Sequence, residues 1–215
     1  MKKILYTAVL MLMTATVLTS CGNLQENRQD EQENNLEIKP EIIQEVNPEK
    51  RQVSVTYEIK CSQDVVDALD MVITYKDKGG INATDTLRDT IWTKTVVNEV
   101  IPVKIGLSWS LSPKSADKIT KETYENLAAS YSITKIEEGS SDQMFIARDN
   151  LFHYYPSYKD FPASKLSNLC DYENYENTQA LTNHHYVNSR CYMLKPITDA
   201  NGNKDIIDEP AYWDD

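Results

Sequence analysis

Two cysteines and two histidines near the end of the chain are the first residues whose types suggest chemistry. Cys170 and Cys191 are separated by about 20 residues. In an oxidising compartment, a disulfide between them would stabilise the fold by roughly 3 kcal/mol through loop closure. His184 and His185 lie between them and raise zinc as an alternative. Zinc ligands usually come in close pairs, and neighbouring histidines on a strand point to opposite faces. We therefore expect a disulfide, with unpaired thiols as the alternative, and no metal.

An oxygen-rich stretch, DANGNKD at residues 199–205, is the next candidate. Its carboxylate and amide side chains occupy alternating positions, as many calcium ligands do: Asp199, Asn201, Asn203 and Asp205. An EF-hand loop would continue with glycine and glutamate at places where this chain has Lys204 and Pro210. A solvated hairpin turn explains the same residues more simply, so we expect no cofactor.

The short motifs of common enzyme classes are missing from the sequence. It contains no G-x-S-x-G, H-E-x-x-H, P-loop or dinucleotide-binding pattern. A glycosidase needs only two carboxylates, and 33 acidic residues offer many pairs. We expect a protein that is not an enzyme, and a small envelope hydrolase is the alternative.

The N-terminus has the pattern of an exported protein. Two lysines precede an apolar run over residues 4–17, which is shorter than the ~20 residues that span a bilayer. The run leads into LTSC, which resembles the lipobox of bacterial lipoproteins. The resemblance implies that residues 1–20 are a signal peptide and that Cys21 carries the lipid, palmitate included. An ordinary signal peptide with an incidental cysteine is the alternative.

Residues 21–50 combine this cysteine with a polar, acidic leader. Glu, Gln and Asn dominate it, and it has too few apolar side chains to offset the entropy of ordering. This composition predicts a flexible tether. Its early carboxylates resemble the export signal that sends many lipoproteins of Bacteroidetes-type bacteria to the outer cell surface. We therefore expect an outer-membrane protein at the cell surface, with a periplasmic spacer as the alternative.

The overall charge excludes one class of partner. The chain has 33 acidic and 22 basic residues, a formal net charge of −11. Without a basic patch to offset this charge, nucleic acid is a poor partner.

The elements that must position any site begin at residue 51, where apolar and polar residues start to alternate. In RQVSVTYEIKCS, the apolar residues occupy every second position: Val53, Val55, Tyr57, Ile59 and Cys61. The segment IPVKIGLSWSLSP shows the same period and places Trp109 on its apolar side. About six or seven short strands at this spacing predict that residues 51–137 form an antiparallel β-sandwich with Trp109 in its core.

The same region resembles the immunoglobulin-like domains of small surface lipoproteins in Bacteroidetes-type bacteria. The resemblance depends on the strand spacing and on the phrases MVITYKD and WTKTV. It implies a mainly β fold, an antiparallel Ig-like β-sandwich, but it implies no activity, because such sandwiches serve unrelated functions.

Residues 138–215 are rich in aromatic residues, and their aliphatic periodicity is weaker. We expect an extension packed on the sandwich, with a partly disordered tail as the alternative. The stretch DFPASKLSNLCDYENY predicts a short helix with Ser164 as its N-cap. A hairpin with its turn at Asn201 and Gly202 is expected to follow.

Three tyrosines in this region are the candidate ligand contacts. Tyr154, Tyr155 and Tyr158 lie between prolines that oppose regular helix, and tyrosine-bearing loops offer stiff contact surfaces. The alternative is that these rings cover the sandwich. The resulting prediction is a lipid-anchored, non-catalytic binding or scaffold module for a glycan or protein. A surface-fibre subunit assembled by strand addition is a further alternative.

Two threonines are candidate modification sites. Asp85-Thr86-Leu87 and Asp89-Thr90-Ile91 resemble the Asp-Ser/Thr-aliphatic sequence that is O-glycosylated in exported proteins of Bacteroidetes-type bacteria. The resemblance implies glycans on Thr86 and Thr90. Because threonine is common in strands, two unmodified strand residues are the alternative.

Overall fold

The computed structural model describes residues 48–152, 159–182 and 190–214, all of them within one compact unit, Gln44–Asp215. The predicted signal peptide, Cys21 and nearly all of the predicted tether therefore lie outside the described residues. Among the helices in these ranges, none is long and apolar enough to cross a membrane.

One antiparallel sheet has four strands in the order β4-β1-β7-β8. Its strands are β1 (Glu49–Cys61), β4 (Ile91–Ile101), β7 (Ala129–Glu137) and β8 (Met144–Asn150). The predicted alternation in β1 is confirmed, because its inward side chains are fully buried: Val53, Val55, Tyr57 and Ile59. The polar residues between them lie on the opposite face, as a period of two requires.

A second antiparallel sheet has five strands in the order β11-β10-β5-β2-β3. Its strands are β2 (Leu69–Lys76), β3 (Asn82–Thr86), β5 (Val103–Pro113), β10 (Cys191–Thr198) and β11 (Lys204–Pro210). The expected hairpin joins β10 to β11, and Gly202 in its turn has φ = 84°. Glycine adopts this conformation without a Cβ penalty.

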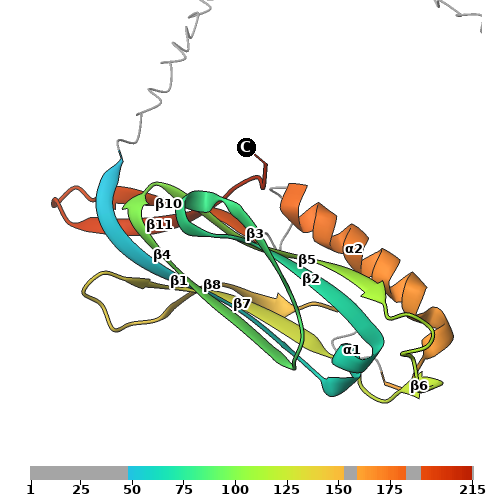
Figure 1. Ribbon diagram of the computed structural model, residues 1–215. Coiled ribbons are helices and arrows are strands. Elements are labelled where there is room, and N and C mark those ends of the chain that lie inside the picture. The colour runs from blue at the N-terminus through green and yellow to red at the C-terminus, as the bar shows by residue number, and fades with distance from the viewer. Residues whose placement is uncertain (1–47, 153–158, 183–189, 215) are drawn as a thin grey trace, which may run out of the picture. The chain divides into compact units, whose positions relative to one another are not determined.

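Short elements connect the strands (Figure 1). They are α1 (Gln63–Ala68), η1 (Lys78–Gly80), β6 (Thr123–Tyr124), β9 (Phe161–Pro162) and η2 (Ala163–Lys165). The longest helix among the described residues, α2 (Leu166–Thr182), lies alongside β5 (Figure 1). It is longer than the predicted short helix, and Ser164 lies in η2 before it.

Aromatic rings from the two sheets meet between them. The ring centroids of Trp109 in β5 and Tyr131 in β7 are 5.3 Å apart. Those of Tyr57 in β1 and Tyr75 in β2 are 5.8 Å apart. Trp109 is 3% exposed, so its predicted place in the core is confirmed. The described residues form a mainly β fold of antiparallel sheets in a sandwich-like arrangement, as predicted; the Ig-like resemblance stays a prediction.

The alternation in β7 also carries a lysine onto the buried face. Lys135 is 2% exposed, and its Nζ donates to the backbone carbonyl of Ile206 in β11 at 2.5 Å. The carboxylates of Glu137 and Asp208 lie 3.4 and 3.6 Å from the same atom. A buried ammonium needs such partners to offset its lost hydration, and here they link the two sheets.

The sheets extend beyond the predicted boundary at residue 137. Strand β8 pairs with β7 in the first sheet, while β10 and β11 complete the second. Periodicity missed β8 because it is an outer strand on which no residue is buried. The described parts of the predicted aromatic-rich extension, 138–215, thus supply strands to both sheets.

The C-terminal end packs against the second sheet. The ring of Trp213 lies over Gly106, where an added Cβ would come within 2.7 Å of that ring. The Nζ of Lys76 donates to the carbonyl oxygen of Trp213 at 2.8 Å and lies 4.6 Å from the ring centroid. Burial lowers the pKa of Lys76. This packing requires a glycine at position 106, because any larger residue would displace the indole.

Candidate functional site: a groove on the outer face of the four-stranded sheet

Four residues of the predicted sites lie outside the described residues. They are the lipidation site Cys21 and the candidate ligand contacts Tyr154, Tyr155 and Tyr158. The histidines of the rejected zinc site are also outside. In the described ranges, no group of three or more potential metal ligands gathers.

The predicted disulfide between Cys170 and Cys191 is not formed in the structure. Cys170 lies on the buried face of α2, and burial raises its pKa to about 12. Cys191 begins β10, and its thiol donates to the carbonyl oxygen of Tyr212 at 3.6 Å. Each cysteine therefore behaves as a small buried side chain, the alternative that the sequence left open.

Thr86 and Thr90 lie near each other in the chain but in different surroundings. Thr86 is exposed at the end of the outer strand β3, whereas Thr90 is half-buried just before β4. The backbone amide of each threonine donates to the side chain of the preceding aspartate, Asp85 or Asp89, at 2.7 Å. Glycosylation of these hydroxyls stays a prediction.

The oxygen-rich stretch at 199–205 is the turn of the β10-β11 hairpin. The carboxylate of Asp199 accepts hydrogen bonds from the backbone amides of Asn201 and Asn203, each at 2.8 Å. It also accepts one from the side-chain amide of Asn203 at 2.8 Å. These bonds hold the turn, as the simpler interpretation of the sequence proposed.

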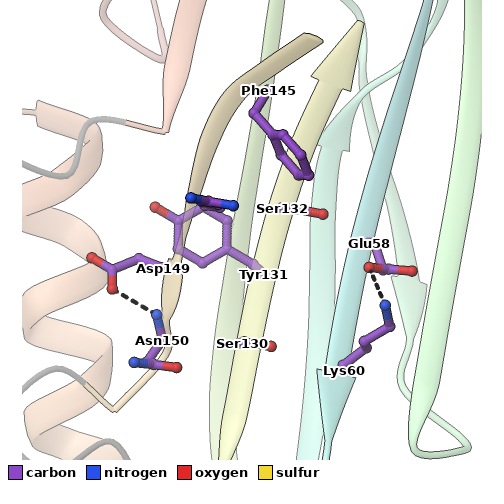
Figure 2. Close-up of a pocket in the computed structure, with 9 residues that line it drawn as sticks. Glu58, Lys60, Ser130, Tyr131, Ser132, Phe145, Asp149 and Asn150 are labelled. Atoms are coloured by element: carbon purple, nitrogen blue, oxygen red, sulfur yellow. Dashed lines mark hydrogen bonds and ion pairs between the residues drawn. The ribbon is translucent and has the colours of Figure 1, made fainter. Parts of the chain in front are cut away.

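An open groove of about 480 Å³ lies on the outer face of the first sheet, over β1, β7 and β8 (Figure 2). It is lined by Glu58, Lys60, Ser130, Tyr131, Ser132, Phe145, Arg148, Asp149 and Asn150. Most of these side chains occupy the polar positions of the alternating pattern, whose apolar positions build the core.

Strand register explains how the lining side chains come together. Directly opposite residues form one row of Glu58, Ser132 and Arg148, and a second row of Lys60, Ser130 and Asn150. A register shift between Ile133 and Thr134 then brings Phe145 opposite Thr134. Opposite residues on one face have Cβ atoms ~5 Å apart, so the three side chains of each row lie side by side.

The groove combines an exposed ring with paired charges. Phe145 is 59% exposed, and the guanidinium of Arg148 lies 5.1 Å from its ring centroid. Glu58 and Lys60 form an ion pair at 2.8 Å, and the side chain of Asp149 accepts from the backbone amide of Asn150 at 2.7 Å (Figure 2). The lining thus contains two acidic and two basic residues, and Asp149 lies opposite Tyr131, on the other face of β8 from Arg148.

A second hollow of about 310 Å³ continues the groove. It shares Lys60, Ser130 and Asn150 with the first. It extends past the end of β1 to Ser62 and Asn126. The two hollows therefore form one surface, which we call the outer groove.

Sequence reasoning missed the outer groove, because its polar positions look the same as any solvated strand face. Glu58 and Lys60 occupy polar positions in the alternating stretch at residues 51–62, but nothing in the pattern distinguishes a binding face from a solvated one. The signal that was present is Phe145, a large aromatic residue in a polar stretch.

Comparison with protein-family models, curated proteins and solved structures finds no match for this chain.

Proposed function

We propose that this protein is a non-catalytic binding module whose contact surface is the outer groove. The observation that carries the proposal is the exposed ring of Phe145, beside Arg148 and two rows of polar side chains. An exposed phenylalanine contributes little to folding, whereas an aromatic ring flanked by hydrogen-bonding groups is typical of recognition surfaces.

The electrostatics of the groove favour contact over proton transfer. The carboxylate of Glu58 is paired with the ammonium of Lys60 at 2.8 Å. Such an ion pair favours the charged carboxylate, which is suited to contact with a ligand and not to donating a proton. The glutamate with the strongly raised pKa, Glu173, is 1% exposed on α2 and does not line the outer groove. A general acid must reach its substrate, and this buried carboxyl is poorly placed to do so.

We also propose that the module is held at the outer membrane by lipid on Cys21, with the acidic tether between lipid and fold. The support is the LTSC sequence after a short apolar run. More than one acyl chain gives lasting attachment. Cys21→Ser should shift the protein from the membrane fraction to the soluble fraction or leave it unprocessed. A variant that still fractionates with membranes at the mature size contradicts the anchor.

The binding proposal is tested with the full chain against arrays of glycans and peptides. Phe145→Ala and Arg148→Ala should abolish the signals that the wild type gives. Val72→Ala and Arg88→Ala are matched controls, because they remove an exposed apolar side chain and an exposed arginine away from the groove. Binding that survives both groove variants, or wild type that binds nothing, contradicts the proposal.

A fibre subunit is the second candidate, because strand β4 ends the first sheet and exposes apolar side chains. Ile91, Val97 and Val100 are 58%, 40% and 45% exposed. Such an edge invites pairing with another chain. The observation predicts concentration-dependent assembly that Val97→Lys prevents, measured by light scattering. A chain that stays monomeric at high concentration removes this candidate.

A further inference from the structure

The outer groove is long in one direction. Along β7, it extends from the level of Thr134, opposite Phe145, to Ala128 beside the second hollow. At ~3.4 Å per residue, this stretch of strand is about 20 Å long. A surface of this length suits a chain of several units better than one small molecule.

The hydrogen-bonding groups of the groove are mostly uncharged. Hydroxyls come from Ser130 and Ser132, and amides come from Asn126 and Asn150. Each hydroxyl or amide both donates and accepts, as the hydroxyls of a sugar do. Glu58 and Lys60 pair with each other, and the lining contains one further residue of each sign, Asp149 and Arg148, so the groove carries no large net charge of either sign.

Phe145 supplies a flat apolar surface at one end of the groove. The guanidinium of Arg148 lies near the ring at 5.1 Å, yet more than half of the phenylalanine side chain remains exposed. A sugar ring has an apolar C–H face and a rim of hydroxyls. It can therefore stack on such a ring while its rim meets neighbouring donors and acceptors.

The position of the groove in the sheet weighs against a peptide. The floor of the groove is formed by β1, β7 and β8, and the two inner strands, β1 and β7, are each paired with a strand on both sides. Their backbone groups are already used, so an extended peptide could add as a strand only at the outer edge of β8 and not across the face of the groove. An acidic polymer would also meet the net charge of −11.

Together these observations point to one ligand class. We infer that the outer groove binds a neutral, linear oligosaccharide, with one sugar stacked on Phe145 and further units running toward Asn126. This inference rests on the proposed binding function and names its ligand.

Calorimetric titration of the full chain with neutral gluco-, manno- and xylo-oligosaccharides, from disaccharide to hexasaccharide, tests the inference. Affinity should rise with length for one linkage series and change little with salt, because no net charge is neutralised. Phe145→Ala should weaken binding about tenfold or more at every length. Asn126→Ala should remove only the gain shown by the longer chains.

Two controls separate the possible failures. Val72→Ala and Asn82→Ala remove an exposed apolar and an exposed amide side chain elsewhere, and should bind like the wild type. If a peptide or an acidic polysaccharide binds through Phe145 and no neutral oligosaccharide does, the inference is overturned while the binding function stands. If nothing binds in a Phe145-dependent way, both are overturned.

Discussion

Strand β5 is held by two different kinds of contact, apolar packing on its inward face and hydrogen bonds with helix α2 along part of its edge. On its inward face, apolar side chains pack between the two sheets. Along its backbone edge, helix α2 takes the place that a further strand would occupy (Figure 1). We call this second contact the helix seam, formed by Ser108, Trp109 and Leu111 of β5 with Glu173, Asn174 and Asn177 of α2 and with Arg190.

Side-chain amides replace a strand along the helix seam. The amide of Leu111 donates to Oδ1 of Asn174 at 2.8 Å, and Nδ2 of Asn174 donates back to the carbonyl oxygen of Leu111 at 2.9 Å. The Nδ2 of Asn177 donates to the carbonyl oxygen of Trp109 at 2.8 Å and to the hydroxyl of Ser108 at 3.1 Å. The two asparagines thus cover backbone groups that β10 leaves unpaired.

The comparison teaches that burial in this protein has two sources. The packing on the inward face of β5 is mainly apolar and should tolerate apolar residues of similar volume, because the hydrophobic effect is non-directional. The helix seam is polar and depends on direction, so a change of one atom leaves a buried donor or acceptor without a partner. Substitutions on the apolar side should therefore destabilise the fold through lost packing, and substitutions in the helix seam through unpaired polar groups.

The largest effect is expected from Trp109→Ala, on the apolar side. The indole is 3% exposed, packs 5.3 Å from the Tyr131 ring, and has the guanidinium of Arg190 3.9 Å from its centroid. Loss of a buried aromatic ring should lower the free energy of unfolding by about 3–5 kcal/mol. Denaturant unfolding measures this. A loss below about 1 kcal/mol would show that the ring is not a core residue.

Sequence patterns predicted the apolar side well. Period-two alternation located β1, β5 and the core residue Trp109, because a strand with one buried face must bury every second residue. The β10-β11 hairpin followed from Asn201 and Gly202, since few other residues accept the backbone angles of a tight turn. These features are local, so a short window of sequence contains them.

The helix seam and the outer groove could not be predicted in this way. Asn174 and Asn177 look like surface residues of a polar helix until β5 is placed beside them, and their partners lie more than 60 residues away. Phe145 entered the groove only through a register shift, which no periodic pattern records. Long-range side-chain geometry determined both features.

The next effect in size is expected from Asn177→Ala in the helix seam. It removes two hydrogen bonds and leaves the buried carbonyl of Trp109 without this donor, at a cost of about 1–3 kcal/mol. Thr178→Ala is the control on the same helix, because Thr178 is exposed and bonds only within α2. Its effect should be within ~0.5 kcal/mol. Equal losses in the two variants, measured by denaturant unfolding, would mean that the seam bonds add nothing specific.

A smaller, pH-dependent effect is expected from Glu173. Its pKa is raised to about 8, mainly by burial and also by the charge of Glu176, while the charge of Arg190 opposes the shift. Because the folded-state pKa lies above the ordinary value of 4.5, folding favours the protonated carboxyl. This contribution is complete below pH 4.5 and is lost as pH rises toward about 8.

Glu173→Gln keeps the shape of the side chain and cannot ionise. The variant should show a flatter dependence of unfolding free energy on pH and should exceed the wild type above about pH 8. Unfolding curves across this range measure the difference. If the wild type and the variant differ by a constant amount at every pH, Glu173 does not titrate in the helix seam.

The smallest effect on stability, and the largest on binding, is expected from Phe145→Ala. More than half of this side chain is exposed, and the guanidinium of Arg148 lies 5.1 Å from the centroid of its ring. Truncation should therefore change the free energy of unfolding by no more than ~0.5 kcal/mol, in contrast to Trp109→Ala. Thermal unfolding and oligosaccharide titration of the same preparations separate the two roles. A core ring supports the fold and affects a ligand only through it, whereas a groove ring can be removed from a fully folded protein. If Phe145→Ala lowers stability as much as Asn177→Ala does, the ring belongs to the packed structure and the outer groove loses its main contact.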